Sequence, residues 1–285
     1  MKKYNELIAI VLVSYYSDEL VKKFLKQIPS NYKVLITDNT NSNILKNDIE
    51  NAFDNVKVFI PKFNLGNGGG INFALKKSNT KYVLYFDLDI EIEEDTIEKL
   101  IVIAESINDW GILAPNLKDY NYDQNFFLDN KSSKKITSMN FVEGCALLFN
   151  IQKLKKIGFF DEKIFLYYEE NDLFFRCIKN NFKILLCKNI YIRHFGNSSV
   201  NKKYQIEIEL NRNWHYMWSK FYYYKKNYSY LRGLKETFLQ FIKAAFKSLF
   251  FYFINRKRFL IYKNRLSGLF NSYLNKPSWK RPNIK

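Results

Sequence analysis

Two patterns of hydrophobic and polar positions alternate along the first 115 residues of the chain. Short apolar runs rich in β-branched residues are separated by longer stretches in which apolar residues recur with helical spacing. The apolar runs predict strands at 7–14, 32–38, 56–60, 82–87 and 111–114. The stretches between them predict helices at 18–27, 43–51, 68–78 and 94–106. This alternation is typical of an α/β fold, in which a Rossmann-like, mainly parallel sheet is connected by right-handed crossovers.

Beyond Pro115 the same alternation continues, but the pattern is weaker. Short strands are predicted at 126–129, 135–142, 182–187 and 190–194. Helices are predicted at 151–157 and 170–179. The α/β pattern therefore extends to about residue 205, and we expect one domain over residues 1–205 and a helical, basic and aromatic region over 206–285.

The C-terminal region contains a long helical pattern from Leu231 to Leu260, with apolar residues three and four positions apart and lysines between them. This pattern predicts an amphipathic helix with a cationic face. The run Leu249–Ile254 is apolar all round, which favours binding to a membrane surface over simple packing on the first domain; both interpretations remain open. No stretch reaches the roughly 18 uncharged apolar residues of a membrane span.

Charge is distributed unevenly along the chain. The formal net charge is +17, of which residues 201–285 carry +16 and residues 1–200 carry +1. A cationic C-terminal region points to an anionic partner, either a membrane surface or a nucleic acid. The three cysteines, Cys145, Cys177 and Cys187, lie among apolar residues without C-x-x-C spacing, so we expect reduced thiols in the core.

Candidate chemistry begins at the stretch Tyr82–Asp89, where a predicted buried strand ends in two carboxylates, Asp87 and Asp89. Residues two apart on an extended chain point to the same side, so both acids should face the same ligand. Ligands of open α/β sheets bind beyond the carboxyl ends of strands, and paired carboxylates there can hold a divalent cation. The simpler interpretation is a strand end followed by solvated acids.

The segment Asn64–Asn72 contains four glycines and joins a predicted strand to a predicted helix. Glycine permits close approach of the backbone to a ligand, which favours a ligand-facing loop over a plain turn. The spacing matches neither the dinucleotide-binding G-x-G-x-x-G motif nor the phosphate-binding P-loop.

An acidic cluster and a histidine follow later in the chain. Glu169, Glu170 and Asp172 come after an aromatic run, where they could cap a helix or supply a general base. His194 ends a predicted strand before a loop rich in Gly, Asn and Ser, which makes it a candidate metal ligand, although a lone histidine is usually structural.

Taken together, these motifs resemble glycosyltransferase family 2, which has the GT-A fold, and most closely its bacterial rhamnosyltransferase-type members. The matching segments run in the family's order over residues 8–199: 13–17, 37–40, 64–72, 87–89, 142–148, 158–162, 168–176 and 194–198. Two positions depart from the family pattern, Tyr16 in place of Asn and Glu170 in place of Asp.

The resemblance implies an inverting transferase of the hexosyltransferase type that moves a sugar from a nucleotide diphosphate sugar to an acceptor hydroxyl. The acceptor implied is a lipid-linked or cell-surface glycan precursor, such as that of an O-antigen or a capsule. A divalent metal, Mg²⁺ or Mn²⁺, would be held by Asp89, Asp87 and His194. Glu170 would act as the general base, with Glu169 and Asp172 as rival candidates.

Further roles follow from the same resemblance. The residues that would bind the nucleotide sugar are Ser14, Tyr15, Asp38, Asn39, Asn64, Gly66, Asn72 and Asp87. The residues on the acceptor side would be Gly144, Asp161 and Glu162, and Arg176 would brace its helix by pairing with an acid.

We expect a cytoplasmic protein that lies peripherally on the inner face of the cytoplasmic membrane, with the anionic membrane surface as a partner and no nucleic acid. Two alternatives stay open: a nucleic-acid-binding protein that uses the basic tail, and a catalytically inactive relative that binds nucleotide sugars.

Overall fold

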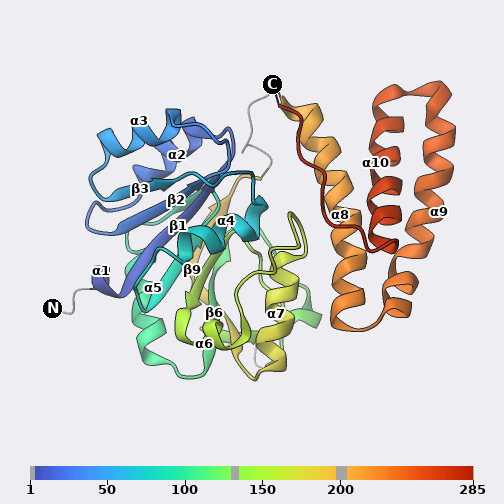
Figure 1. Cartoon of the computed structure of the whole chain (residues 1–285). Coiled ribbons are helices and arrows are strands. Elements are labelled where there is room, and N and C mark those ends of the chain that lie inside the picture. The colour runs from blue at the N-terminus through green and yellow to red at the C-terminus, as the bar shows by residue number, and fades with distance from the viewer. Residues whose placement is uncertain (1–3, 130–134, 197–203, 285) are drawn as a thin grey trace. The chain divides into compact units, whose positions relative to one another are not determined.

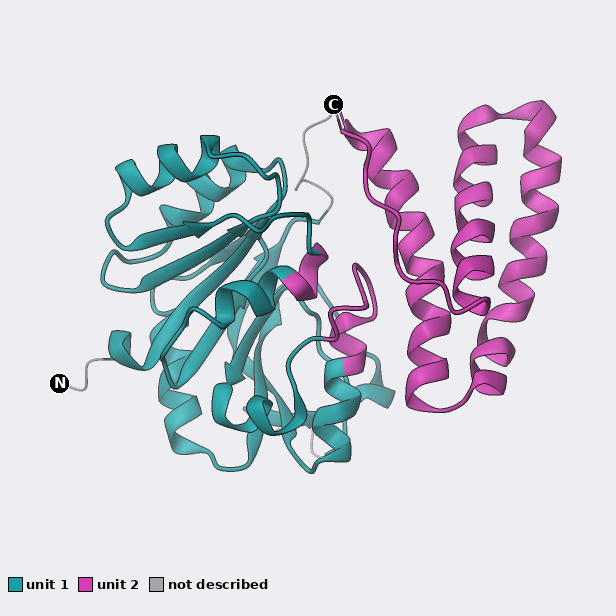
Figure 2. Ribbon diagram, viewed as in Figure 1, with its two compact units in different colours: residues 1–65, 70–160, 173–200 teal, residues 66–69, 161–172, 201–285 magenta. Residues whose placement is uncertain are grey.

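The computed structural model describes residues 4–129, 135–196 and 204–284. The chain divides into two compact units, which Figure 2 shows in different colours. Unit 1 comprises residues 1–65, 70–160 and 173–200, and unit 2 comprises residues 66–69, 161–172 and 201–285. The expected division into 1–205 and 206–285 stays a prediction; this grouping differs from it because two short internal segments belong with the C-terminal helices.

Unit 1 is built on one mixed sheet of nine strands within the described residues (Figure 1). The strands are β1 (Ile8–Ser14), β2 (Lys33–Asp38), β3 (Val56–Phe59), β4 (Tyr82–Phe86), β5 (Ile90–Ile92), β6 (Trp110–Leu117), β7 (Ile136–Met139), β8 (Ala146–Asn150) and β9 (Lys183–His194). Their order is β3-β2-β1-β4-β8-β6-β9-β5, and β7 also pairs with β9. The first four strands in this order are mutually parallel, and β8 is antiparallel to both of its neighbours.

Helices cover both faces of this sheet. The helices of this part of the chain are α1 (Tyr4–Leu7), α2 (Asp18–Leu25), α3 (Ile44–Ala52), α4 (Gly66–Leu75), α5 (Thr96–Ser106), α6 (Ile151–Ile157) and α7 (Glu169–Lys179). Alternation along β1 sends Ile8, Ile10 and Leu12 into one core with α2, α3 and α5. Ala9 and Val11 point into a second core with residues of α4, α6 and α7. The expected α/β architecture is therefore confirmed.

The structure differs from the sequence-predicted strands at four of them. The two expected strands 182–187 and 190–194 form the single strand β9, which pairs with β5, β6 and β7. Strand β6 continues through Pro115 to Leu117, with a register shift after the proline, as expected where a ladder N–H is missing. The expected strand at 126–129 was wrong: a 3₁₀ turn covers Gln124–Phe126, and a single bridge joins Phe127 to Met139.

The cysteines behave as expected. Cys145, Cys177 and Cys187 are all buried and free. Burial raises the pKa of the Cys177 and Cys187 thiols to about 12 and raises that of Cys145 well above its ordinary value. These thiols are protonated core residues, since a raised pKa suppresses the reactive thiolate.

Unit 2 contains three long helices, α8 (Gln205–Asn227), α9 (Tyr230–Ile254) and α10 (Arg256–Tyr273). The single helix expected from Leu231 to Leu260 is wrong, because α9 ends at Ile254 and α10 begins at Arg256. Asn255 causes the break: its side chain accepts a hydrogen bond from the backbone N–H of Arg258 and so caps the start of α10.

Glycines allow these three helices to pack closely. A Cβ at Gly233 in α9 would lie 2.8 Å from the ring of Phe221 in α8, and one at Gly268 in α10 would lie 2.3 Å from the carbonyl oxygen of Trp214. Met217 and Phe221 of α8 and Leu269 of α10 form the apolar centre of this bundle. Helices α9 and α10 are therefore structural partners of α8.

Helix α9 also carries a large exposed apolar surface. By length and composition it is the one helix among the described residues that could cross a membrane, and only 11% of its most apolar window is buried. The expectation that no stretch reaches a span rested on uncharged runs, whereas α9 meets a criterion that admits a few charges. Large exposed apolar surface of this kind is typical of a binding surface.

Candidate active site

Two carboxylates stand where strand β4 ends. Strand β4 is fully buried, and its chain continues through Asp87, Leu88 and Asp89 into the short strand β5. Leu88 turns into the core, while the two aspartates lie on the opposite side, as the alternation predicted. The Asp89 side chain is only 7% exposed and that of Asp87 is 36% exposed.

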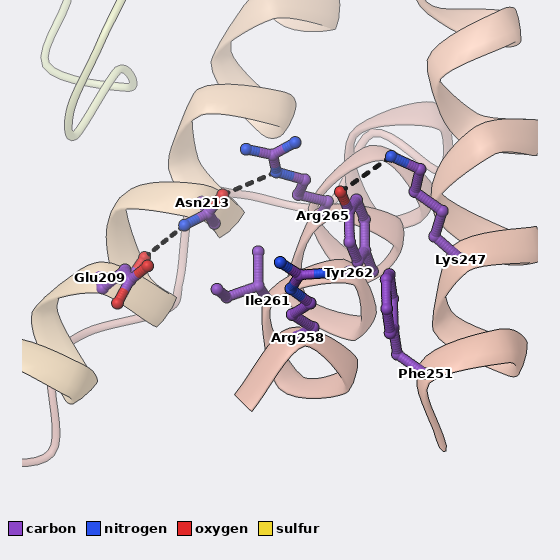
Figure 3. Close-up of a pocket in the computed structure, with 8 residues that line it drawn as sticks. All are labelled: Glu209, Asn213, Lys247, Phe251, Arg258, Ile261, Tyr262 and Arg265. Carbon is purple, nitrogen blue, oxygen red and sulfur yellow. Dashed lines mark hydrogen bonds between the residues drawn. The ribbon is translucent and has the colours of Figure 1, made fainter. Parts of the chain in front are cut away.

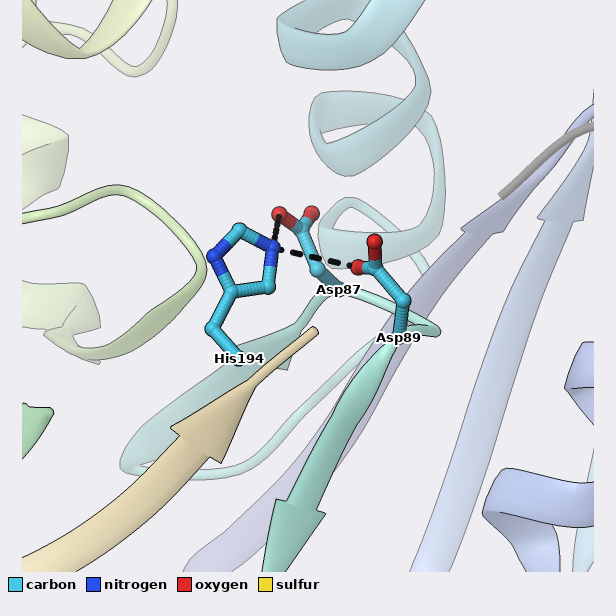
Figure 4. A group of neighbouring side chains, drawn as sticks. All are labelled: Asp87, Asp89 and His194. Carbon is cyan, nitrogen blue, oxygen red and sulfur yellow. Dashed lines mark ion pairs between the residues drawn. The ribbon is translucent and has the colours of Figure 1, made fainter. Parts of the chain in front are cut away.

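Strand pairing brings His194 to these acids. β5 runs antiparallel to β9, and their register places Ile90 opposite His194. The backbone N–H of Phe195 donates a hydrogen bond to the carbonyl oxygen of Asp89, which holds the two strand ends together. Figure 4 shows the imidazole facing both carboxylates, with its Nε2 3.2 Å from Asp89 Oδ1 and 3.9 Å from Asp87 Oδ2.

The electrostatics of the three side chains are mutually dependent. The hydrogen bond with Asp89 raises the pKa of His194; burial opposes this rise, and the charges of Asp89, Asp87 and Glu143 add to it. Tyr85 donates a short hydrogen bond from its hydroxyl to Asp87 Oδ1. The backbone N–H of Asp87 donates to the carbonyl oxygen of Cys145 at 2.8 Å, so this acid is held from two sides.

These residues fit a divalent cation. One ligand atom from each of Asp87, Asp89 and His194 can be chosen so that all lie within 4.8 Å of one another. Two carboxylates and an imidazole form a donor set that suits Mn²⁺ or Mg²⁺. A nearly buried carboxylate such as Asp89 is stabilised by a positive partner, which His194 or a bound cation can supply.

The ends of β1 and β2 carry four of the predicted nucleotide-binding residues. Ser14 and Asp38 are paired in register, and both are buried. The Ser14 hydroxyl has no hydrogen-bond partner among the described residues, which is uncommon for a buried group. Burial raises the pKa of Asp38, whose carboxylate accepts hydrogen bonds from Thr40. Tyr15, directly after β1, is half-buried.

Asn39 continues this strand end toward the next connection. Its side-chain oxygen accepts a hydrogen bond from the backbone N–H of Leu65. Its backbone N–H donates a hydrogen bond to the carbonyl oxygen of Ser14. It therefore links the end of β1 to the segment before α4. Asn64, the residue before Leu65, is half-buried.

The glycine segment is helical where a loop was expected. Helix α4 begins at Gly66, so most of Asn64–Asn72 lies in its first turns. Gly66 has φ +77°, and a Cβ there would lie 2.0 Å from the carbonyl oxygen of Phe165. In unit 1, a Cβ at Gly70 would lie 2.9 Å from Val13. Close packing therefore accounts for Gly66 and Gly70, and the expected role of this segment in binding a ligand stays a prediction.

Asn72 has a bracing role in the structure. Its amide nitrogen donates to the carbonyl oxygen of Phe160 at 2.9 Å, and its amide oxygen accepts from the N–H of the same residue at 3.1 Å. Arg176 braces a neighbouring segment: its guanidinium donates to the carbonyl oxygens of Ile157, Gly158 and Phe159. Arg176 thus braces this segment through carbonyl oxygens, and the pairing with an acid that the resemblance implied stays a prediction.

Unit 2 carries the acidic cluster. Two aspartates of this unit, one of them in the cluster, share one lysine. Lys226 lies 2.8 Å from Asp161 and 2.7 Å from Asp172, which is completely buried. Asn227 donates a further hydrogen bond to Asp172, and Tyr222 donates one to Asp161. Burial alone would raise the pKa of Asp161, but hydrogen bonds from Lys226, the Lys163 backbone and Tyr222, together with the Lys226 charge, lower it overall. Asp172 and Asp161 are therefore held in ion pairs.

The segment before α7 adopts an unusual backbone. Tyr167 and Tyr168 have φ values of +64° and +68°, which residues other than glycine rarely adopt. Aromatic contacts with Tyr216 hold both rings, and Tyr168 also packs on Tyr223. Such strain is stored mainly at functional sites.

The remaining predicted site residues lie close to this strained segment or before β8. Glu169 opens α7 and is buried, Glu170 follows it and is half-buried, and Glu162 is exposed. Gly144 forms the turn before β8 and is half-buried. The last part of the motif His194–Ser198 lies outside the described residues.

Sequence reasoning missed two kinds of residue. Tyr85 lies two residues before Asp87 on the same strand, so the alternation that paired the aspartates could have found it. Lys226 and Asn227 come from the far end of α8, and no local pattern linked them to Asp172.

Comparison with known proteins places this geometry in context. The model of the family described as "Glycosyl transferase family 2" matches residues 10–165, which include both aspartates of the candidate metal site. The low-salt glycan biosynthesis hexosyltransferase Agl10 of Haloferax volcanii is 22% identical over 225 residues, covering 71% of this chain and 72% of that protein.

Solved structures with the same fold are glycosyltransferases. The mannosyltransferase PcManGT from Pyrobaculum calidifontis, in complex with GDP-Man and Mn²⁺, aligns with a TM-score of 0.57 at 11% identity, covering 95% of this chain and 88% of that one. TarS 1-349 of S. aureus, in complex with UDP, aligns with a TM-score of 0.53 at 13% identity, covering 94% and 92%. At these identities the likeness shows the fold alone, and the fold is GT-A, as the sequence resemblance implied.

Proposed function

The chain belongs to glycosyl transferase family 2, and from that premise we propose that it moves a hexose from a nucleotide diphosphate sugar to an acceptor hydroxyl, with inversion. The proposed acceptor is a lipid-linked or cell-surface glycan precursor. Membership of the family makes the chain a glycosyltransferase; the inversion, the acceptor and the rhamnosyltransferase-like subtype belong to the proposal.

One observation carries this proposal. His194, which is far along the chain from Asp87 and Asp89, is brought to them at the edge of the sheet where the parallel strands β1, β2 and β4 end. Open α/β sheets bind their ligands at this edge. The donor set fits a divalent cation, and PcManGT was solved with GDP-Man and Mn²⁺.

We propose that Asp87, Asp89 and His194 hold the cation beside the diphosphate of the donor. Bound there, the cation would neutralise the charge that develops on the leaving diphosphate. Tyr85 and the Cys145 carbonyl fix Asp87 in position for this task. Ser14, with its unpartnered buried hydroxyl, ends the neighbouring strand, where the nucleotide is proposed to bind.

Glu170 is the proposed general base. The acceptor oxygen attacks the anomeric carbon, the bond from that carbon to the diphosphate breaks with its electron pair leaving on the diphosphate, and the acceptor proton goes to Glu170. One displacement of this kind inverts the configuration. The engagement of Asp172 by Lys226 and Asn227 supports this choice between the acids, as does the strained backbone before α7.

We further propose that α9 attaches the protein to the inner face of the cytoplasmic membrane. Exposed apolar side chains gather along this helix, among them Leu239, Phe246, Leu249 and Phe253, which are 68% to 81% exposed. Lysines and arginines of α9 and α10 would add attraction to acidic lipid. A lipid-linked acceptor would lie at the same interface.

A screen of donors tests the proposed reaction. The purified full chain is incubated with UDP-, GDP- and dTDP-sugars, each with Mg²⁺, Mn²⁺ or a chelator, and release of the nucleoside diphosphate is measured. We expect slow hydrolysis of one donor class that stops in the chelator. Asp89→Asn should abolish both metal-dependent nucleotide binding and turnover.

The matched control is Glu91→Gln, which removes the carboxylate two residues further along, where Glu91 pairs with Arg193 on the surface. Its activity should equal that of the unmodified protein. Full activity of Asp89→Asn would remove the metal-site assignment. Binding of a donor without turnover on any acceptor would favour an inactive relative, and retention on nucleic acid without donor binding would favour a nucleic-acid-binding protein.

Truncation of the tail near Tyr228 is a poor test of membrane attachment, because α8 packs on α9 and α10. Substitution of exposed positions leaves that packing intact. Leu249→Ser together with Phe253→Ser should release the protein from liposomes and leave donor hydrolysis unchanged. Undiminished liposome binding of this double variant would show that the exposed face of α9 does not attach the protein.

A further inference from the structure

A basic pocket lies within the helical bundle of unit 2. It has a volume of about 440 Å³ and is formed between α8, α9 and α10 (Figure 3). Its lining residues are Glu209, Asn213, Lys247, Phe251, Arg258, Ile261, Tyr262 and Arg265. None of these residues belongs to the candidate active site, so the pocket needs its own explanation.

The charge of this pocket is strongly positive. Lys247, Arg258 and Arg265 are its cations, and among the described residues none of the three forms an ion pair with a carboxylate. The one acid in the lining, Glu209, is paired with Lys257 at 2.9 Å. Three cations with no acid of their own create a site for an anion.

An aromatic platform holds these cations in place. Phe251 of α9 and Tyr262 of α10 stack with their planes 10° apart. Arg258 lies over the Phe251 ring at 5.2 Å, and Arg265 lies over the Tyr262 ring at 5.5 Å. Lys247 donates a hydrogen bond to the Tyr262 hydroxyl at 3.1 Å, as Figure 3 shows. The basic side chains are therefore ordered around one space.

The Tyr262 hydroxyl reflects the positive potential in this space. The hydrogen bond from Lys247 lowers its pKa, and the charges of Lys247, Arg265 and Arg258 lower it further against the opposing effect of burial. A phosphate oxygen placed near the same cations would gain the stabilisation that the phenolate gains here.

Apolar surface of the same helix adjoins the pocket in sequence. Phe250, Tyr252, Phe253 and Ile254, which flank Phe251, are 52% to 81% exposed. A soluble anion would leave these apolar side chains exposed to water. A lipid could contact the cations with its phosphate and the apolar side chains with its hydrocarbon chains. Charge and apolar surface in one segment thus favour a lipid over a free phosphate or a nucleic acid.

We propose that this pocket binds the phosphate of an anionic membrane lipid headgroup, with Lys247, Arg258 and Arg265 contacting its oxygens. The proposal rests on the membrane attachment of α9 proposed above. It adds that attachment is selective: the headgroup is recognised in a built site, beyond the general attraction between a basic surface and an acidic bilayer.

Charge-matched variants separate these two effects. Lys247→Gln removes a cation inside the pocket, and Lys243→Gln removes one a single turn earlier on α9, exposed and outside the pocket. Likewise Arg258→Gln is matched by Arg256→Gln. Loss of one cation near an acidic bilayer weakens binding about fivefold. Loss of a charge-assisted hydrogen bond in the pocket should weaken it roughly 10- to 100-fold.

Binding is measured by co-sedimentation with vesicles of phosphatidylcholine alone or with phosphatidic acid or phosphatidylglycerol added. We expect Lys247→Gln and Arg258→Gln to weaken binding to the acidic vesicles roughly 10- to 100-fold, while both controls weaken it only about fivefold. All four variants should hydrolyse donor sugar as the unmodified protein does, which shows that each is folded. Inorganic phosphate in solution should compete only at far higher concentration than lipid.

Three outcomes would overturn the proposal. Equal weakening by the pocket variants and their controls would leave general electrostatics only, with the membrane attachment still standing. Equal competition by soluble phosphate and by lipid would make the pocket a site for a free anion. No binding of the unmodified protein to any vesicle would refute the attachment and the headgroup site together, without bearing on the transferase reaction.

Discussion

His215 should make the helical unit sensitive to mild acid. Its ring is completely buried in α8, where Nε2 donates to the carbonyl oxygen of Lys280 at 2.8 Å and Nδ1 accepts from the Ser278 hydroxyl at 3.0 Å. Both contacts suit a neutral imidazole. Burial lowers the pKa of His215 to about 3; the hydrogen bond to Lys280 opposes this, and the charges of Arg281 and Lys280 add to it.

The sign and size of the effect follow from this pKa. The pKa of His215 in the folded protein lies below its unfolded-state pKa of about 6.5. Between these two pH values the unfolded chain therefore binds more protons than the folded protein. Stability is therefore complete above about pH 6.5 and is lost as the pH falls toward about 3. A pH of about 5 lies roughly 1.5 units below the unfolded-state pKa. At that pH the free energy of unfolding is therefore about 2 kcal/mol lower than at neutral pH.

Urea unfolding followed by tryptophan fluorescence measures this loss. Three of the four tryptophans, Trp214, Trp218 and Trp279, lie in unit 2, so the signal reports mainly on that unit. The free energy of unfolding is compared at about pH 7.5 and pH 5 for the unmodified protein and for His215→Gln. The second histidine of the chain is present in both proteins, so its titration cancels in the difference.

His215→Gln should be less stable at neutral pH, because it loses the histidine's two hydrogen bonds, yet it should lose about 2 kcal/mol less on acidification. Equal losses in the two proteins would refute the reasoning. In that case His215 would not be held neutral by the packing of the C-terminal segment on α8.

Three further predictions concern the acids and the glycines. Glu170→Gln should keep donor binding and lose turnover by about 10²–10⁴-fold in a coupled transfer assay; an inactive Asp172→Asn beside an active Glu170→Gln would reassign the base. Lys226→Met should lower the free energy of unfolding by about 3 kcal/mol in urea titrations, because it leaves the completely buried Asp172 without its cation; a loss under about 1 kcal/mol would contradict this ion pair's role. Gly66→Ala should destabilise by more than about 2 kcal/mol, since φ is +77° and a carbonyl oxygen lies only 2.0 Å from the Cβ position. Gly196→Ala is its control, with φ +60° in open space, and equal melting temperatures for the two would refute the packing argument.

Local patterns determined much of this protein. The apolar runs identified β1, β2, β3 and β4 within a residue or two, because a buried strand must be apolar along its length. The end of β4 also marked Asp87 and Asp89 as a pair on one side, since alternation is a property of the extended chain itself. The order of short motifs was enough to indicate the family, which the match over residues 10–165 shows.

Other features depended on contacts between distant segments. Glycine-rich sequence at 64–72 suggested a loop, yet α4 begins at Gly66, where the Phe165 carbonyl oxygen leaves no room for a Cβ. The helical pattern from Leu231 continued through Asn255, where a side-chain cap starts a new helix instead. Residue types alone could not distinguish a loop from a helix at 64–72, or one helix from two after Leu231. Each result depends on which distant segment packs against the residues concerned.

The candidate site shows the same division. The sequence proposed His194 as a metal ligand, but its meeting with Asp89 follows from the antiparallel register of β5 and β9. Among the acids at 169, 170 and 172 the resemblance favoured Glu170 as the base, and the approach of Lys226 from α8, which distinguishes Asp172, was not visible in the sequence. Register and long-range ion pairs arise when the whole chain folds, since they join residues that no local periodicity connects.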